Sequence, residues 1–368
     1  MRQGNFAHNG HLCEIVPGCI AHNGCLRRGR RRQAAPGRVA AGGPRPHAYS
    51  GPVVSMGVSI GPPPGERPSA VERPARPSPV IQALEALCAD PRVKRAEDAL
   101  REASAELRWH EALRRRWREA RAEAAVRGAI ASAAAEGAVL PTGVLRDAVA
   151  NRSLTRAATG DPSLDAAAGL WRAGVRLTEW MPDLRGEARP AQPSPRTLLA
   201  ALHRDVAGPL AATGRIPLDA VAAPRGPGVV PLEGGPGAPP DAGALHARID
   251  ALLELIDAPG APALARAAVV HAEMITARPF IAGNAAVGRL LVRHLITRDG
   301  LEPTGVAVAD QYAARAPGAY ADAAAAYASG RPDGVSAWIV WQAEAILVGI
   351  QEAQRICRSI QAGTTAEH

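Results

Sequence analysis

The sequence predicts an all-α domain, and three observations lead to that prediction. Hydrophobic residues make up 47% of the 368 residues, so a sizeable core can form. Aromatic residues make up only 3%, so Ala, Leu, Val and Ile must build that core, which favours close helix packing over a β-sandwich. From residue 80 onward, long helix-favouring stretches alternate with short stops that contain Pro or Gly.

The N-terminal part differs in composition from the rest of the chain. Residues 1–79 are rich in Gly, Pro and Arg and lack a hydrophobic period, so we expect a disordered tail. Residues 1–80 hold eleven arginines and three glutamates and no lysine or aspartate, which accounts for the whole net charge of +8. The domain itself is therefore neutral. The arginine-rich run 27–32 leaves nucleic-acid binding by the tail open, but a solvated tail is the preferred interpretation.

The cysteines and the apolar runs exclude several classes of protein. The five cysteines are odd in number and three lie in the tail, so they imply no disulfide framework. Five residues separate Cys13 from Cys19 and Cys19 from Cys25, which fits no zinc site, so we expect no bound metal there. No apolar run approaches the roughly 18 residues of a membrane span, and no signal-peptide core follows Met1. We expect a cytoplasmic protein without a membrane partner.

The helical domain is predicted over residues 80–362. Asp90-Pro91 starts the second helix with proline in its first turn, and Leu100, Leu107 and Trp117 recur on one face of the helix-favouring stretch that follows. Later helices end at clear stops such as 257–260 and 298–300. The predicted helices cover residues 80–89, 92–135, 142–151, 162–181, 195–213, 216–222, 242–257, 262–277, 284–298, 309–328 and 333–361.

One long segment inside the domain is not helical. Residues 223–241 contain six prolines and many glycines, and only Val229 and Val230 resemble a strand. We expect a loop or a short β-hairpin-like flap here. Loops of this length inside compact domains are often functional.

The most informative stretch is the turn between two apolar helices at residues 278–289. Arg278-Pro279 ends the first helix, because the residue before proline is disfavoured in the helical region. Gly283-Asn284 opens the next helix. The free N–H groups and the positive dipole end of such a helix start form an anion site. In the simplest alternative, Gly283 is only a turn glycine, Asn284 only a helix cap and Arg289 only a surface arginine.

This turn resembles the motif of the Fic (Fido) family, H-P-F-x-[DE]-G-N-G-R-x-x-R. The matching residues are Pro279, Phe280, Gly283, Asn284 and Arg289, and the departing ones are Arg278, Ala282, Ala285 and Ala286. The resemblance covers about residues 125–355. It implies a Fic-type helical domain, and members of the family typically transfer AMP from ATP to a Ser, Thr or Tyr hydroxyl of a target protein.

Two further segments resemble parts of the same family. Ser132, Glu136 and Gly137 fit the inhibitory-helix pattern [ST]-x-x-x-E-[GN], which places that helix at about residues 125–137. The resemblance implies that Glu136 reaches Arg289 and blocks productive ATP binding. The alternative is a Glu–Arg pair that only fixes one helix against the motif. The flap at 223–241 lies where the family docks its target, with Arg225, Val229 and Val230 at the corresponding places.

The departures from the motif remove groups that the family chemistry needs. Arg278 stands at the place of the general-base histidine, and a guanidinium has no lone pair to accept a proton. Ala282 offers no oxygen ligand, so we do not expect Mg²⁺ to bind in the family manner. Ala286 lacks a phosphate-binding side chain. Gly283, Asn284 and Arg289 remain to hold ATP or another nucleotide or phosphate, with Arg278 as an additional phosphate ligand.

The leading hypothesis is thus a degenerate Fic-domain protein with a retained nucleotide or phosphate pocket and weak or absent transferase activity. One alternative is an active AMP transferase, or a related nucleotidyl or phosphoryl transferase, with a rearranged site. The other is a nucleic-acid-associated protein that acts through its basic tail. The expected partner is a protein target or regulator that the sequence does not identify, and a homodimer stays open.

Overall fold

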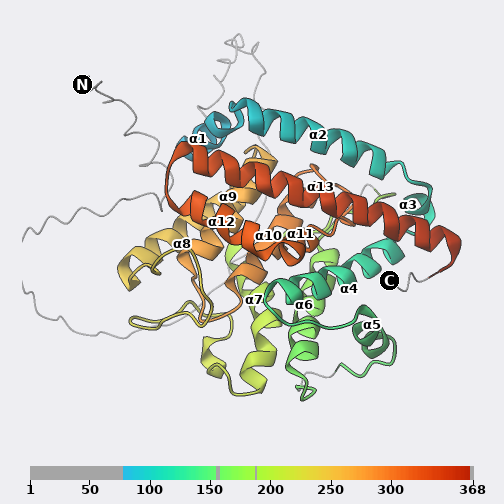
Figure 1. Ribbon diagram of the computed structural model, residues 1–368, viewed down its shortest axis with the longest axis horizontal. Helices are drawn as coiled ribbons and strands as arrows, with labels where there is room; N and C mark the ends of the chain where they lie inside the picture. Colours follow the sequence, from blue (N-terminus) through green and yellow to red (C-terminus); the bar gives the residue numbers. More distant parts are fainter. Residues whose placement is uncertain (1–77, 155–157, 187–188, 365–368) are drawn as a thin grey trace, which may run out of the picture. The chain divides into compact units, whose positions relative to one another are not determined.

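The computed structural model describes residues 78–154, 158–186 and 189–364. The predicted disordered tail lies outside these residues, apart from Ser78 and Pro79 at its end. Within the described ranges every regular element is helical, with thirteen α-helices and one 3₁₀ turn (Figure 1). The predicted all-α class is therefore confirmed.

The helices follow one another without long interruptions, except between α7 and α8. Their bounds are α1 Pro79–Cys88, α2 Pro91–Arg108, α3 Glu111–Arg115, α4 Trp117–Ala135, α5 Thr142–Ala150, α6 Pro162–Glu179, α7 Pro195–Ala212, η1 Leu218–Ala220, α8 Ala242–Asp257, α9 Ala263–Ala277, α10 Asn284–Arg298, α11 Asp310–Arg315, α12 Pro317–Ala328 and α13 Pro332–Ala362.

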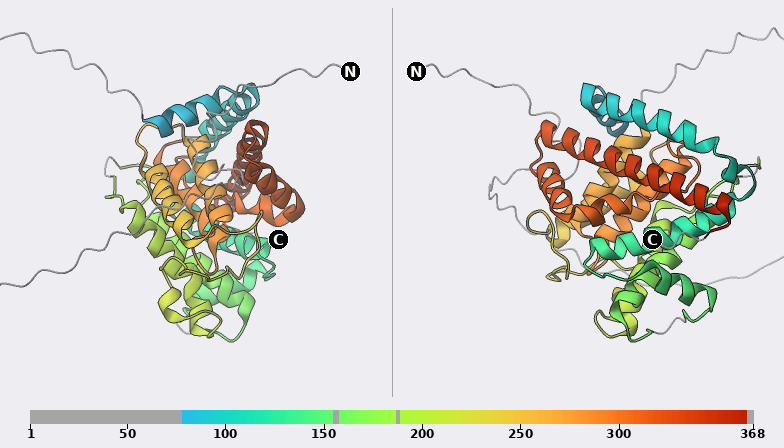
Figure 2. Two further views of the ribbon diagram at one scale, coloured as in Figure 1. Left: turned by 90° about the vertical axis from the view of Figure 1, so that its left-hand side faces the viewer. Right: turned by 45° about the vertical axis from the view of Figure 1, so that its right-hand side comes forward.

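The α9–α10 pair forms the centre of the core. Every residue of α9 from Leu264 to Ala277 is buried, and α10 packs along it. In Figures 1 and 2, α2 and α13 lie side by side at one end of the described helices, while α6 and α7 lie at the other. The turn 278–283 that joins α9 to α10 is thus held by buried helices on both of its sides.

Two of the predicted helices are divided into shorter ones, because a helix cap or a proline interrupts the backbone hydrogen bonds. The stretch 92–135 forms α2, α3 and α4, because the side chain of His110 accepts the N–H of Ala112 and starts a new helix. The stretch 309–328 divides at Ala316, whose φ of −136° leaves the helical region directly before Pro317. The predicted helix 216–222 contains only the 3₁₀ turn η1.

Four aromatic residues, Tyr320, Tyr327, Trp338 and Trp341, gather where α9, α12 and α13 meet. Trp338 is fully buried and donates its indole N–H to the carbonyl of Ala268 at 2.7 Å. It stacks on Trp341 with ring centroids 5.1 Å apart, and Tyr320 lies 5.0 Å from Trp341. His271 bonds to the Tyr320 hydroxyl at 2.9 Å, so this cluster joins α9 to both C-terminal helices. None of the described helices is long and apolar enough to span a bilayer.

Gly349 lets α13 lie directly on the loop before α11. A Cβ atom there would come 2.6 Å from the backbone N of Ala309 and 2.8 Å from the carbonyl carbon of Val308. The Val308 N–H also donates to the Gly349 carbonyl at 3.2 Å, so neither backbone can withdraw without losing this bond.

We therefore expect Gly349→Ala to lower the free energy of unfolding by about 2 kcal/mol, as overpacking outweighs the gain in helix propensity. Urea denaturation measures the change. Gly143→Ala is the matched control, since a Cβ on this exposed α5 residue meets nothing within 4 Å. It should leave stability unchanged or raise it by about 0.5–1 kcal/mol. Equal effects of the two substitutions would contradict the close contact.

Candidate functional site

The turn between α9 and α10 is closed by the side chain of Asn284. Arg278 ends α9 in the left-handed region at φ 45°, and Gly283 lies at φ 80° directly before α10. The Asn284 amide accepts the N–H of Phe280 at 2.8 Å and donates to the Phe280 carbonyl at 3.0 Å. Its side chain is therefore committed to the turn, and only its backbone N–H is left for a ligand.

His203 supports the turn from α7. Its ring stacks on Phe280, with centroids 3.7 Å apart and an interplanar angle of 8°. Its Nδ1 accepts the N–H of Ala222 at 2.8 Å, so Nε2 carries the proton and donates to the carbonyl of Ala282 at 3.0 Å. Burial lowers the pKa of His203 to about 4, and a second ring proton would break the bond from Ala222.

Acidification should therefore destabilise the protein through His203. The unfolded chain takes up a proton at this histidine below pH 6.5, whereas the folded chain does so only below about pH 4. The unfolding free energy then falls between pH 6.5 and 4, by about 2 kcal/mol at pH 5 from this residue. Denaturation at pH 7 and pH 5 should give a smaller difference in unfolding free energy for His203→Gln than for the unmodified protein. The exposed His246 on α8 provides the control. If His246→Gln reduces the difference between the two pH values as much as His203→Gln does, this account is contradicted.

Arg289 joins α10 to the end of α4. Its Nε donates to the hydroxyl of Ser132 at 2.9 Å, and its Nη2 donates to Glu136 Oε1 at 2.7 Å. Asp310 adds an ion pair at 3.4 Å. Burial alone would lower the pKa of this guanidinium, but the charges of Glu136 and Asp310 outweigh it and the pKa rises. The side chain of Arg289 is 5% exposed and that of Glu136 is 36% exposed.

The structure thus brings Ser132, Glu136 and Arg289 together as the resemblance implied. Gly137 follows directly, at φ 84°, where α4 ends. Glu136 is thus the solvent-facing member of the pair, and Arg289 is the buried one.

A residue that the sequence analysis did not single out fills the anion site. Glu233 of the flap accepts the N–H of Gly283 with Oε2 at 3.0 Å and the N–H of Asn284 with Oε1 at 2.7 Å. Burial and the nearby Glu136 carboxylate raise the pKa of Glu233. The only available signal was that Glu233 is the sole acidic residue in 223–240.

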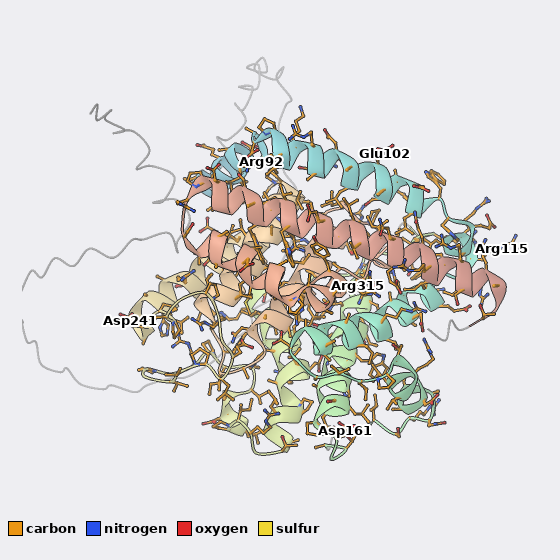
Figure 3. The ribbon with its side chains drawn as sticks, viewed as in Figure 1. Arg92, Glu102, Arg115, Asp161, Asp241 and Arg315 are labelled. Carbon is orange, nitrogen blue, oxygen red and sulfur yellow. The ribbon has the colours of Figure 1, made fainter. Side chains whose placement is uncertain are left out.

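The flap lies along the turn but forms no strand in its described residues 223–241, so the hairpin-like expectation needs correction. Two isolated backbone bonds connect it to the turn, from Arg225 N to the Pro279 carbonyl at 2.8 Å and from Leu232 N to the Ile281 carbonyl at 2.7 Å. Proline and glycine interrupt any longer ladder. Asp241, labelled in Figure 3, ends the flap and caps α8.

Arg225 holds the flap in shape from within. Its Nε donates to the Arg278 carbonyl at 2.9 Å, its Nη1 to the Val229 carbonyl at 3.1 Å and its Nη2 to the Pro240 carbonyl at 2.7 Å. Val229 is partly buried, whereas Val230 is 70% exposed. Arg225 is therefore a structural residue of the flap, and Val230 is available to a partner.

The Arg278 side chain also binds to the flap. Its Nη2 donates to the Gly237 carbonyl at 2.5 Å, and its Nε is buried without a hydrogen-bond partner among the described residues. The guanidinium that we expected as an additional phosphate ligand is thus bound to a flap carbonyl. The Glu233 carboxylate acts on it as a nearby opposite charge.

A cavity of about 560 Å³ lies beside the anion site. Its lining includes Glu136 from the end of α4, Glu233 from the flap, and Gly283 from the turn. Ala282 and Ala286, two of the positions that depart from the motif, also face it. Its volume is in the range of small-molecule pockets.

The residues of this cavity do not fit a magnesium ion held in the family manner. Ala282 contributes no oxygen, the Glu136 carboxylate is paired with Arg289, and the Glu233 carboxylate accepts two backbone N–H groups. The third carboxylate of the lining, Asp165 on α6, accepts the N–H and the hydroxyl of Thr159 with Oδ1. In the described part of the chain, no group of three or more His, Cys, Asp or Glu side chains forms a metal-binding cluster.

Comparison with known proteins bears on the family and the fold. The sequence model of the Fic/DOC family matches residues 194–296, which span α7, the flap, α9 and most of α10. No curated protein matches the sequence.

Two solved structures share the fold. The crystal structure of a Fic family protein from Desulfovibrio desulfuricans G20 is 18% identical, with a TM-score of 0.54 over 71% of this chain and 74% of that chain. Fic-1 (residues 134–508) from C. elegans is 15% identical, with a TM-score of 0.53 over 78% of this chain and 77% of that chain. The family match over the motif and the shared helical fold lead to one conclusion: residues 194–296 of this chain match the Fic/DOC family, and its described helices have the fold of Fic-family structures.

Proposed function

We propose that this Fic-domain protein binds a nucleotide or another phosphate compound at the start of α10 and transfers AMP weakly or not at all. The observation that carries the proposal is the pair of N–H groups on Gly283 and Asn284, which converge on one anion beside a 560 Å³ cavity. The guanidinium of Arg289, on the same helix, is paired with Glu136, which lines that cavity. A helix start with convergent N–H groups and a nearby arginine is suited to phosphate.

Loss of transfer follows from the side chains at the reacting position. The Arg278 guanidinium stays protonated and is held by the Gly237 carbonyl, so it cannot accept the proton of a target hydroxyl. Removal of a positioned general base slows a reaction by about 10²–10⁴-fold. With alanine at 282 and 286, the cavity also lacks a metal ligand and a phosphate clamp, which the transfer of a charged phosphoryl group needs.

The flap supports a protein as the further partner. Val230 is 70% and Leu232 is 64% exposed on the segment that lies along the motif turn. In the family this segment docks the target chain. The proposed role is therefore a binding or regulatory one, in which an unidentified protein contacts the flap while a phosphate compound occupies the turn.

Isothermal calorimetry with ATP tests the pocket. The full-length variant Glu136→Gly/Glu233→Ala removes the two carboxylates that occupy Arg289 and the N–H groups of the helix start, and we expect it to bind ATP saturably. Arg289→Ala in the same background should weaken binding by about tenfold or more, because a charge-assisted contact to phosphate is lost. Absence of ATP binding in the double variant would refute the pocket.

Two outcomes would favour the other functions. Incorporation of labelled AMP by the unmodified protein would establish an active transferase with a rearranged site. Salt-dependent DNA binding that disappears on deletion of residues 1–60 would establish a nucleic-acid role of the basic tail.

A further inference from the structure

We propose that the Glu233 carboxylate occupies the phosphate site of its own protein. It would block ligand binding there independently of the pairing of Glu136 with Arg289. This inference rests on the proposed function, since it takes the N–H groups of Gly283 and Asn284 as the ligand's contacts. The protein would then bind a phosphate compound only after the Glu233 carboxylate has left the site.

The contacts of Glu233 are those expected of a bound anion. Each carboxylate oxygen accepts one backbone N–H, at 3.0 Å from Gly283 and at 2.7 Å from Asn284. Both N–H groups belong to the start of α10, where the helix dipole also favours a negative charge. These are the first orphan donors of the helix, so a phosphate oxygen and the Glu233 carboxylate cannot use them at the same time.

The flap determines the position of the carboxylate. The neighbouring Leu232 donates its N–H to the Ile281 carbonyl at 2.7 Å, which fixes the backbone directly before Glu233. On the other side, Arg278 holds the Gly237 carbonyl at 2.5 Å. Arg225 ties the two ends of the flap together through its bonds to Val229 and Pro240. These bonds fix the backbone of the flap, so the carboxylate can leave the N–H groups either by movement of the flap or by a change of the Glu233 rotamer toward the cavity.

The replacement of the motif histidine acquires a role in this arrangement. Arg278 is a positioning residue, because its guanidinium both bonds to the flap and attracts Glu233. A histidine is too short to reach the Gly237 carbonyl in the same way. The substitution that removes the general base thus also helps to hold the closed flap.

The two inhibitory carboxylates bind to different positive groups. Glu136 engages the Arg289 guanidinium, whereas Glu233 engages the helix start. Their carboxylates line one cavity and repel each other. Removal of Glu136 alone relieves that repulsion and leaves Glu233 in the phosphate site. We therefore expect Glu136→Gly by itself to be insufficient for tight binding of a phosphate compound.

Calorimetry tests this expectation by measuring the affinity for inorganic pyrophosphate of four full-length proteins. These are the unmodified chain, Glu136→Gly, Glu233→Ala and the double variant. The double variant should bind pyrophosphate about tenfold or more tightly than Glu136→Gly, since the competing anion is gone. Glu233→Gln keeps the size of the side chain and removes its charge, and it should act in the same direction. The control is Glu254→Ala on the exposed face of α8, with no expected change. Equal affinities of Glu136→Gly and the double variant, where both bind, would overturn the inference.

Amide hydrogen exchange without any ligand tests the contact itself. The N–H groups of Gly283 and Asn284 should exchange about tenfold or more faster in Glu233→Ala and in Glu233→Gln than in the unmodified chain. Glu136→Gly and Glu254→Ala should leave them protected. Unchanged exchange in both Glu233 variants would overturn the inference whatever the binding data show. Faster exchange together with no pyrophosphate binding by the double variant would support the Glu233 contact and refute the proposed pocket.

Discussion

AMP transfer should appear when the four departing motif positions are changed together with Glu136 and Glu233. The variant combines Arg278→His, Ala282→Asp, Ala285→Gly, Ala286→Arg, Glu136→Gly and Glu233→Ala. It regains a group that titrates near neutral pH, an oxygen ligand for Mg²⁺ and a phosphate contact, and it loses both internal competitors. Incorporation of labelled AMP into the protein itself, measured with ATP and Mg²⁺, reports the gain.

The cavity has room for these side chains. Ala282 and Ala286 both line the 560 Å³ space, so the longer side chains extend into it rather than into the core. The change at position 278 also removes the bond to the Gly237 carbonyl, which loosens the flap over the site.

The same variant without Arg278→His is the matched control. It should transfer AMP about 10²–10⁴-fold more slowly, the usual effect of removing a positioned base. If the complete variant folds, binds ATP and still incorporates no AMP, the geometry of the pocket has changed as well as the motif. The family chemistry would then not be recoverable by restoring side chains.

Arg289→Ala should have the largest effect on stability among single changes at the site. The guanidinium is 5% exposed and serves Ser132, Glu136 and Asp310, so its removal leaves two carboxylates and a buried hydroxyl without their partner. Because Glu136 is 36% exposed, the pair is only partly buried, and loss of the guanidinium destabilises by about 2 kcal/mol. Urea denaturation measures the stability, and calorimetry with ATP measures the loss of binding in the Glu136→Gly/Glu233→Ala background.

A surface arginine and a double-mutant cycle control this prediction. Arg196→Ala, whose side chain is 74% exposed on α7, should change stability by no more than about 0.5 kcal/mol. Arg289→Ala/Glu136→Ala should recover part of the stability, because the unpaired carboxylate is removed with its partner. If the cycle shows strong coupling while no variant with Arg289 binds ATP, the pair is only structural. Additive effects would contradict the ion pair as a stabilising contact.

Much of the fold was predictable because its signals are local. Prolines in the first turn start α2 and α6, and the stops at 257–260 and 298–300 separate helices close to the predicted positions. The expected helix at 216–222 and the strand character of Val229 and Val230 were not confirmed. Propensity could not decide these cases, since the flap and the turn 278–283 satisfy each other's backbone groups.

The sequence by itself determined the helical class, the turn that begins at Arg278 and the chemistry that its substitutions remove. These follow from composition, from proline and glycine at set positions, and from the side chains present in a short motif. Only the tertiary structure decided which groups occupy that turn. The Asn284 amide is turned back onto Phe280, the Arg278 guanidinium binds the flap, and Glu233 reaches Asn284 across 51 residues of sequence. No local pattern encodes such a contact, because it depends on how a long proline-rich loop packs against a helix start that is distant in the chain.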